Sequence, residues 1–525
     1  MKKVFALVLA LAMIFALAIP TMAADAYSIT IDHPNASAPH TYEAYQIFSG
    51  VIDSTNSKLS EVEWGTGIDS AGLLADLMAD AAWSAKVSST TSAEALADML
   101  AHKDTTTAMF ETFRALAGEN LTSVVAASDT DADANKQWVL GLPSAGYYLV
   151  KDKDGSLENE LETYTNYILR VVGQDTLHPK GSSVTVKKDI IDGGAAKEAS
   201  DYSIGDTVHF RVTGTLPTNY GTFSEFYYEI ADTMSAGLTF TPGSVKVYLE
   251  NHGEKLELTN PAAPAEPFFT VSSADAQHVN VVFADLKKIT GRTIDASTII
   301  IMEYDAVLNA AAEIGQPGNR NDAKIIFDNN PYAEGRGETP DDYAWAFTWE
   351  LDTNKTDDLG NSLANAKFVF YRESEGAKQY VILDADNKVA GWTADKSLAT
   401  VIVSEEGVPM PIIGLEADTY YLEETEAPDG YNLLDAPVTV IITAETGGPD
   451  GAGGYTVKTL NVKFGSGDIT DGNKDTGIVE GTVVNKSGTV LPETGGIGTT
   501  MFYIFGGLMF VGAAVLLVTK KRMSY

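Results

Sequence analysis

Residues 345–355 read Trp-Ala-Phe-Thr-Trp-Glu-Leu-Asp-Thr-Asn-Lys, with apolar side chains at every second position from Trp345 to Leu351. Side chains two residues apart share one face of a β-strand, so this alternation predicts a strand with one buried face. Short runs rich in Val, Ile, Tyr, Phe and Thr recur at Tyr27–Ile31, Val184–Ile190, Thr207–Val212, Val245–Leu249, Lys367–Tyr371 and Val438–Ile442. Gly, Asn and Asp residues punctuate them, which favours a mainly β protein built from tandem immunoglobulin-like sandwiches.

One stretch departs from the β pattern. Residues 69–120 are rich in Ala, Leu and Met. We expect two or three helices inserted into the first domain, with an isolated Ala-rich helix bundle as the alternative.

The length of 525 residues suggests three or four domains. Links at 173–183 and 329–342, which contain Pro and Gly, and a third link at 486–490 separate three predicted modules. Their expected bounds are 25–175 for an N-terminal domain with the helical insertion, 176–337 for a middle domain and 338–489 for a C-terminal domain.

The composition excludes several classes of function. The formal charge of −36 disfavours nucleic acid as a partner. Cysteine is absent, which removes disulfides, thiolate metal ligands and cysteine nucleophiles. The seven histidines show no HExxH-like spacing and no Ser/His/Asp signature is visible, so we expect no metal, no cofactor and no enzyme activity.

Both ends of the chain carry membrane-directed segments. Lys2 and Lys3 precede an apolar run that ends at Pro20 and small residues follow, which predicts a signal peptide over 1–24, cleaved after Ala23, Ala24 or Ala26. A second apolar run, Ile497–Val518, is long enough to span a bilayer. The basic residues Lys520, Lys521 and Arg522 follow it, as expected on the cytoplasmic side.

Directly before that run stands Leu491-Pro492-Glu493-Thr494-Gly495. The order of motif, apolar segment and basic tail (490–525) resembles the LPXTG sorting signal of Gram-positive cell-wall proteins. The resemblance implies that a sortase thiolate attacks the Thr494 carbonyl, releases Gly495 onward and passes the acyl group to an amine.

A lysine between the first two modules is the candidate for that amine. The sequence Leu177-His178-Pro179-Lys180-Gly181 resembles the pilin motif of sortase-assembled backbone pilins, which ends in Tyr-Pro-Lys-Asn. This chain keeps Pro179 and Lys180 but has His178 and Gly181 in place of Tyr and Asn. The resemblance implies that Lys180 attacks the acyl-enzyme of the next subunit.

The C-terminal module carries a more specific motif. Residues 420–431 read Tyr-Tyr-Leu-Glu-Glu-Thr-Glu-Ala-Pro-Asp-Gly-Tyr and resemble the pilin E-box, Tyr-x-Leu-x-Glu-Thr-x-Ala-Pro-x-Gly-Tyr, at every specified position. In such Cna B-type domains the resemblance implies a Lys–Asn isopeptide bond, here Lys355 to Asn485 with Glu424 as catalyst. Strand parity independently predicts that all three side chains face the core.

The middle module offers a second set. Lys188 shares parity with Val184, Val186 and Ile190, and Asp232 ends the apolar series Phe226, Tyr228 and Ile230. Residues 202–208, Tyr-Ser-Ile-Gly-Asp-Thr-Val, and 232–238, Asp-Thr-Met-Ser-Ala-Gly-Leu, resemble the fimbrial isopeptide-forming middle domain. We assign a bond from Lys188 to Asn319 with Asp232 as catalyst, and Asn321 stays open as the rival acceptor because parity cannot separate the two.

Two further segments receive simpler interpretations. The first module shows no comparable triad, so no bond is expected there. Asp384-Ala385-Asp386-Asn387-Lys388 could suggest calcium but is read as a hairpin turn.

Together these motifs resemble a sortase-assembled major (backbone) pilin covalently anchored to the cell wall. The implied partners are pilus-specific and housekeeping sortases, identical subunits and peptidoglycan, while minor pilins and a host or mucin ligand stay open. The alternatives are a monomeric wall-anchored adhesin or minor pilin, and a surface enzyme.

Overall fold

The computed structural model describes residues 27–34, 36–53, 58–101, 106–129, 132–164, 166–171, 173–178, 182–262, 266–331, 333–451, 453–488 and 497–522. The predicted signal peptide, the segment Pro179–Gly181 with Lys180, and the motif Leu491–Gly495 lie outside the described residues. The chain divides into two compact units, which are Met1–Ser200 with Asp206–Ala311 and Asn319–Ala346, and Asp201–Gly205 with Ala312–Gly318 and Phe347–Tyr525.

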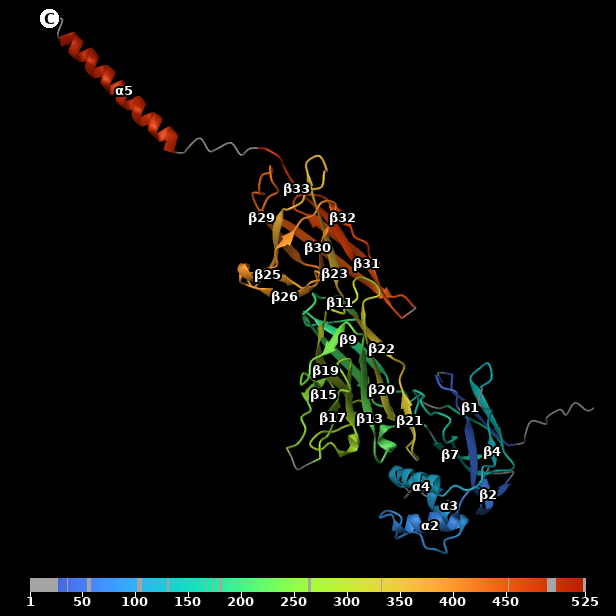
Figure 1. The fold of residues 1–525 in the computed structure, drawn as a ribbon. Coiled ribbons are helices and arrows are strands. Elements are labelled where there is room, and N and C mark those ends of the chain that lie inside the picture. Colours follow the sequence, from blue (N-terminus) through green and yellow to red (C-terminus); the bar gives the residue numbers. More distant parts are fainter. Residues whose placement is uncertain are drawn as a thin grey trace, which may run out of the picture. The chain divides into compact units, whose positions relative to one another are not determined.

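The first unit begins with two small sheets (Figure 1). One sheet has the order β5-β1-β8 and consists of β1 (Ser28–Asp32), β5 (Gln137–Gly141) and β8 (Gln174–Leu177). The other has the order β3-β2-β6-β7, with β4 paired to β2, and consists of β2 (Tyr42–Asp53), β3 (Lys58–Trp64), β4 (Ala126–Ala127), β6 (Gly146–Asp152) and β7 (Asn166–Val171). Strand β8 pairs in parallel with β1, so the end of this region returns to its first strand.

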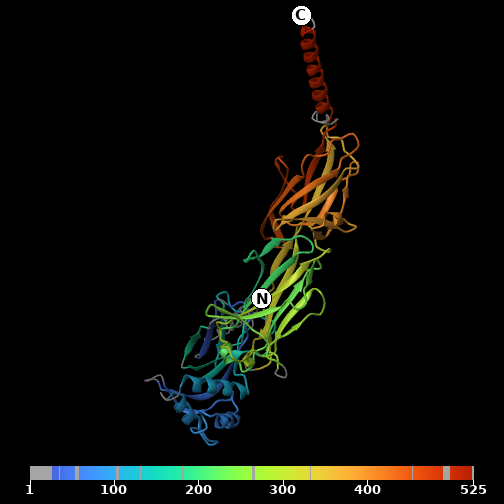
Figure 2. The same cartoon turned by 90° about the vertical axis from the view of Figure 1, so that its left-hand side faces the viewer.

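Three helices form the predicted insertion, and they lie together in both views (Figure 1, Figure 2). They are α2 (Ser70–Ala79), α3 (Ala93–Ala101) and α4 (Thr107–Glu119). Leu77, Leu96 and Phe113 from the helices share one buried cluster with Phe48 of β2 and Leu149 of β6. The helices therefore complete the core of the β-sheet, and the alternative of an isolated bundle is wrong.

The rest of the first unit contains two facing sheets. The first has the order β10-β9-β12-β19-β15-β16 with β14 on β19, from β9 (Val186–Asp192), β10 (Ala195–Lys197), β12 (Thr207–Thr215), β14 (Leu238–Phe240), β15 (Lys246–Asn251), β16 (Glu254–Glu257) and β19 (Ile299–Leu308). The second has the order β11-β22-β20-β13-β18-β17 with β21 on β20, from β11 (Ala199–Asp201), β13 (Tyr228–Met234), β17 (Thr270–Ser272), β18 (His278–Phe283), β20 (Asn319–Asp328), β21 (Arg336–Glu338) and β22 (Asp342–Phe347).

Strand β20 illustrates why these sheets form. Its burial alternates at every residue from Asn319 to Asp328, so one face packs into the sandwich and the other meets solvent. The antiparallel partners β13 and β22 flank it. Because β22 pairs with β20, this sheet extends past residue 337, where the sequence predicted the end of the middle domain.

The second unit contains a three-stranded sheet of order β28-β23-β33 and an eight-stranded sheet. The first consists of β23 (Trp349–Asp357), β28 (Met410–Leu415) and β33 (Ile478–Asn485). The second has the order β26-β25-β24-β29-β30-β31-β32 with β27 on β24, from β24 (Lys367–Ser374), β25 (Ala377–Leu383), β26 (Val389–Thr393), β27 (Ile402–Val403), β29 (Thr419–Glu426), β30 (Val438–Pro449), β31 (Tyr455–Phe464) and β32 (Ile469–Asp471).

Strands β23 and β33 come from opposite ends of this unit and pair in parallel. Burial alternates along β23 from Trp349 to Asp357, which confirms the predicted core-facing series from Trp349 to Lys355. The prediction of a single strand from Trp345 is wrong, because Trp345 and Phe347 belong to β22, in which Ala344–Phe347 are all buried. Beyond β33, α5 (Ile497–Arg522) forms a helix whose Met501–Arg522 segment has a mean hydropathy of 2.3 and is long and apolar enough to cross a membrane.

Candidate functional site

The middle sheets bring four polar side chains together in an apolar interior. Lys188 lies on β9 and Tyr304 on β19 of one sheet, while Asp232 lies on β13 and Asn321 on β20 of the facing sheet. Lys188, Asp232 and Asn321 have no exposed surface, and Tyr304 is 1% exposed. The alternation in the sequence therefore predicted correctly that Lys188, Asp232 and Asn321 are buried.

Hydrogen bonds connect these four groups in a chain. The Lys188 amine contacts the Asp232 carboxylate directly and lies 3.2 Å from the Tyr304 hydroxyl oxygen. The Tyr304 hydroxyl donates to Asp232 Oδ1 at 2.6 Å and accepts from Asn321 Nδ2 at 2.6 Å. The Tyr304 hydroxyl thus bridges the acid and the amide.

Burial controls the protonation of this group. It lowers the pKa of the Lys188 amine and raises the pKa of the Asp232 carboxyl, and the attraction between their charges only partly offsets both shifts. The rings of Phe210 and Tyr304, with centroids 5.1 and 5.4 Å from Nζ, exclude water around the amine. Burial therefore acts toward the neutral pair, a free amine beside a protonated acid.

The two candidate acceptors occupy different surroundings. Asn319 is 1% exposed, and its Nδ2 donates to the carbonyl oxygen of Ala346 at 3.1 Å. Asn321 contacts Tyr304, and its Oδ1 has no hydrogen-bond partner among the residues that the structure describes. Asn321 therefore has a hydrogen bond into the network around Lys188, through the Tyr304 hydroxyl.

The second unit assembles the other predicted triad from three strands. Lys355 on β23 and Asn485 on the parallel neighbour β33 are in adjacent register, because Lys355 lies opposite Val483 and Asp357 lies opposite Asn485. Glu424 lies on β29 of the other sheet. Lys355 is 3%, Glu424 6% and Asn485 0% exposed, as parity predicted.

In this triad the acid contacts the amide. Glu424 Oε2 accepts from Asn485 Nδ2 at 3.0 Å and from the backbone N–H of Leu434 at 2.9 Å. Asn485 Nδ2 also donates to the carbonyl oxygen of Asn432 at 2.6 Å. Within the described chain, Glu424 Oε1 and Asn485 Oδ1 have no partner, which leaves both oxygens available to a proton or an incoming group.

The environment of Lys355 favours the neutral, nucleophilic form of its amine. Its Nζ donates to the carbonyl oxygen of Thr356 at 3.0 Å. Burial lowers the pKa of the Lys355 amine to about 8, although the carboxylates of Glu424 and Asp357 act in the opposite direction. A sizeable neutral fraction of Lys355 therefore exists near neutral pH.

The end of the E-box closes over this site. The backbone N–H of Asn432 donates to the carbonyl oxygen of Lys486 at 3.1 Å, and Tyr431 forms a β-bridge with Ser487. The Tyr431 hydroxyl donates to Asp357 at 3.4 Å. The motif thus both supplies the acid and fixes the loop against the end of β33.

The remaining predicted positions are more ordinary. Asp384–Lys388 forms the tight turn between β25 and β26, in which the N–H of Asp384 donates to the Lys388 carbonyl and Asn387 has a φ of 61°. The hairpin interpretation is confirmed. Before the undescribed Pro179–Gly181 segment, His178 Nδ1 lies 3.2 Å from Asp32 Oδ2.

Sequence reasoning missed two sets of residues. Tyr304 shares parity with Ile300, Met302 and Ala306, and this series could have marked it as core-facing. The first module buries His33, His40, Asp152 and Glu162, whose spacing in the sequence fits no motif. Burial lowers the pKa of His40, but hydrogen bonds to Asp152 and Glu162 outweigh that effect and raise it to about 9.

Comparison with known families identifies two parts of the chain. Residues 350–449 match the SpaA prealbumin-like fold domain, and residues 483–524 match the LPXTG cell wall anchor motif. The first match contains Lys355 and Glu424, and the second contains Asn485. The anchor match places the mature protein on the cell wall.

The chain is also similar to known surface proteins. It is 23% identical over 378 residues to the trypsin-resistant surface T6 protein of Streptococcus pyogenes serotype M6, across 61% of this chain and 66% of that protein. The alignment therefore spans just under two thirds of the relative's length.

Among solved structures, the T6 backbone pilin of serotype M6 Streptococcus pyogenes is 15% identical with a TM-score of 0.53, covering 88% of this chain and 99% of that chain. The full-length major pilin SpaD from Corynebacterium diphtheriae is 16% identical with a TM-score of 0.46, covering 88% and 98%. The chain is thus a wall-anchored, mainly β protein with the fold of the T6 backbone pilin.

Proposed function

We propose that this chain is the backbone subunit of a covalent surface pilus, in which a sortase joins Thr494 of one subunit to Lys180 of the next. The wall-anchor match, the fold and the similarity to the T6 protein support this function. The observation that carries it furthest is the pair of buried lysine–acid–asparagine triads, which lie one after the other between Lys180 and Thr494.

The polymerisation step needs two groups from this protein, the Thr494 carbonyl of one subunit and the Lys180 amine of the next. The sortase thiolate attacks the Thr494 carbonyl carbon, the Thr494–Gly495 bond breaks, and Gly495 onward leaves with its new amino terminus. The Lys180 amine then attacks the thioester, forms an amide and regenerates the thiolate. A housekeeping sortase performs the same transfer to an amine of peptidoglycan for the subunit at the base.

Within the middle sheets we propose a bond from Lys188 to Asn321 rather than to Asn319. The neutral Lys188 amine attacks the side-chain amide carbon of Asn321, the C–N bond to the amide nitrogen breaks, and ammonia leaves. Asp232 supplies a proton toward the amide oxygen and takes one from the attacking amine. Tyr304 positions Asn321 for this exchange through its hydroxyl.

In the second unit we propose the corresponding bond from Lys355 to Asn485. Here Glu424 already contacts the amide group that must leave, and its free Oε1 is the oxygen that can carry the proton. The Lys355 amine attacks the amide carbon, and ammonia leaves as before.

These two bonds place a short covalent path along the subunit. Tension entering at Lys180 reaches Lys188, crosses to Asn321, continues to Lys355, crosses to Asn485 and leaves at Thr494. Residues 189–320 and 356–484 lie outside that path, so the sheets they form need not unfold under load. Residues before Lys180, including the helical insertion, are also outside it.

A blot of wall material released by a muramidase tests the pilus. The natural chain should give a ladder of high-mass species, and Lys180→Ala should reduce it to monomer that still reaches the wall through Thr494. Lys197→Ala is the matched control, because Lys197 is an exposed lysine on β10 of the middle sheet.

Two results would contradict the proposal. A single wall-linked band from the natural chain would indicate the monomeric adhesin or minor pilin instead. A ladder that persists unchanged in Lys180→Ala would show that another lysine is the acceptor.

A further inference from the structure

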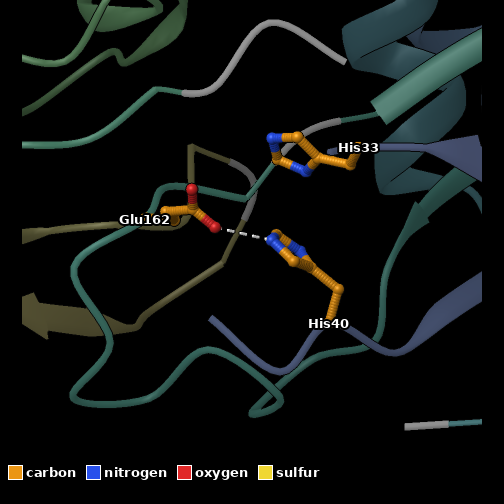
Figure 3. A group of neighbouring side chains, drawn as sticks. All are labelled: His33, His40 and Glu162. Carbon is orange, nitrogen blue, oxygen red and sulfur yellow. Dashed lines mark hydrogen bonds and ion pairs between the residues drawn. The ribbon is translucent and has the colours of Figure 1, made fainter. Parts of the chain in front are cut away.

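The first module buries a cluster of metal-ligating side chains that plays no part in the proposed function. His33 directly follows β1, His40 lies shortly before β2, and Glu162 lies after β6. Figure 3 shows both imidazole rings and the Glu162 carboxylate directed toward a common space. One ligand atom from each residue lies within 4.8 Å of the other two.

The burial of this cluster requires explanation. His33, His40 and Glu162 are 4%, 2% and 3% exposed, so none can rely on water for its hydrogen bonds. Both ring nitrogens of His33 have no hydrogen-bond partner in the described parts of the chain. A buried polar group without a partner is costly, and a ligand bound by the ring nitrogen removes that cost.

Two further contacts orient the other ligands. Asp152 is fully buried and lies 2.7 Å from His40 Nδ1, which directs His40 Nε2 toward Glu162 Oε2 at 2.7 Å. Ser37 donates to Glu162 Oε1 through its hydroxyl at 3.1 Å, which leaves Oε2 for the cluster. A carboxylate behind a ligating histidine is the usual support of a zinc site.

The charges within the cluster also favour a divalent cation. Asp152 and Glu162 bring two negative charges into the interior, beside two imidazoles that are ligands when neutral. Two nitrogen ligands and one oxygen ligand suit Zn²⁺, whereas Ca²⁺ and Mg²⁺ prefer oxygen ligands throughout.

We propose that His33, His40 and Glu162 bind one Zn²⁺ ion, with Asp152 as the positioning residue behind His40. The fourth position of a tetrahedral ion would fall to water or another small ligand. The ion joins the β1–β2 connection to a residue 122 positions beyond His40 (162 − 40 = 122). The chain has no cysteine for a disulfide, so the ion would cross-link the first module, as the proposed Lys–Asn bonds cross-link the other two.

The site also lies beside the point where the chain leaves this module. Glu162 forms a β-bridge with Ser183, and the N–H of Thr163 donates to the Ser182 carbonyl at 3.0 Å. Zn²⁺ bound at Glu162 therefore restrains residues 182–183, to which Glu162 and Thr163 are hydrogen-bonded. The bound metal would therefore stabilise the position of residues 182–183.

Metal titration of the full chain in detergent, stripped beforehand with a chelator, tests the site. Competition with a chromogenic zinc indicator should give one Zn²⁺ per chain, and Ca²⁺ at the same concentration should not compete. Asp152→Asn should weaken the affinity by about 10- to 100-fold, and His33→Ala should weaken it at least as much. His209→Ala is the control, because His209 is exposed and should bind as the natural chain does.

Cobalt substitution covers the case in which His33→Ala does not fold. Co²⁺ bound by the natural chain should show the intense visible absorption of a four-coordinate site, and Zn²⁺ should displace it. No stoichiometric zinc in the natural chain, or unchanged affinity in a folded His33→Ala variant, would overturn the proposal. None of these readouts depends on polymerisation, so a failure here leaves the pilus proposal untouched.

Discussion

In the middle sheets the acid contacts the lysine, whereas in the second unit the acid contacts the asparagine. Asp232 touches the Lys188 amine and reaches Asn321 only through the Tyr304 hydroxyl. Glu424 Oε2 accepts a hydrogen bond directly from Asn485 Nδ2, with no hydroxyl between them. The position of the acid relative to the amine therefore differs between the two triads.

What the triads share is more informative. All three members of each are buried, and Asn321 and Asn485 each have an amide oxygen without a partner in the described residues. An amide oxygen in that state can accept a proton from a neutral acid while the carbon is attacked. Burial and the free amide oxygen, rather than one fixed arrangement of the acid, are the common requirement.

Replacement of Asp232 by Ala should have the largest effect. It removes the acid, so the buried Lys188 amine loses that contact and keeps its hydrogen bond to the Tyr304 hydroxyl. Loss of a cross-link that closes 133 residues (321 − 188 = 133) costs roughly 5 kcal/mol in the chain-entropy description, and the lost hydrogen bond of the buried amine adds about 1 to 3 kcal/mol. Calorimetry should show a large fall in the melting temperature of the first unit, and the intact mass, corrected for the substitution, should rise by about 17 Da.

Replacement of Glu424 by Ala should have a similar but smaller effect. The lost bond closes 130 residues (485 − 355 = 130), again worth roughly 5 kcal/mol. Lys355 keeps its hydrogen bond to the Thr356 carbonyl, so the further loss is limited to the hydrogen bonds that Glu424 accepts from Asn485 and Leu434. Trypsin should now cleave the second unit. A larger fall in the free energy of unfolding than in Asp232→Ala would contradict the difference drawn between the two triads.

The choice between Asn319 and Asn321 gives a smaller but sharper test. Asn321→Ala should lose the middle bond and regain about 17 Da, because its amide carbon is the one attacked. Asn319→Ala should keep the bond, with a loss of only about 1 kcal/mol from its hydrogen bond to Ala346. Intact mass spectrometry of the two variants decides between them, and the reverse result would restore Asn319 as the acceptor.

The smallest effect is a pH dependence in Asn485→Ala, where Lys355 stays an amine. Its pKa is about 8 in the folded chain and about 10.4 when unfolded, so the unfolded state binds more protons between those values. The free energy of unfolding should therefore rise as pH increases from 8 to 10.4. The double variant Lys355→Met/Asn485→Ala is the control, and an equal rise there would assign the effect to other groups.

Strand alternation predicted a good part of these sites. It placed Lys188, Asp232, Lys355 and Asn485 on buried faces, because period-two patterning reports directly which face of a strand is covered. The E-box added Glu424 through a motif whose loop fixes the end of β33. The helical insertion was also recognisable from its composition.

Other features depended on contacts between distant strands, which parity does not report. Asn319 and Asn321 share a face, so only the lateral position of Tyr304 on the opposite sheet separates them. His33, His40 and Glu162 meet because β1, β2 and the segment after β6 converge. No local sequence pattern predicts that convergence. Pairing across long sequence separations is where the sequence alone was insufficient.

The intact mass of the natural ectodomain tests the account most directly. Each Lys–Asn bond releases one ammonia, so two bonds should make the protein about 34 Da lighter than its sequence mass. Peptide mapping should then recover Lys188 joined to Asn321 and Lys355 joined to Asn485. An intact mass equal to the sequence mass would contradict the cross-links in both units.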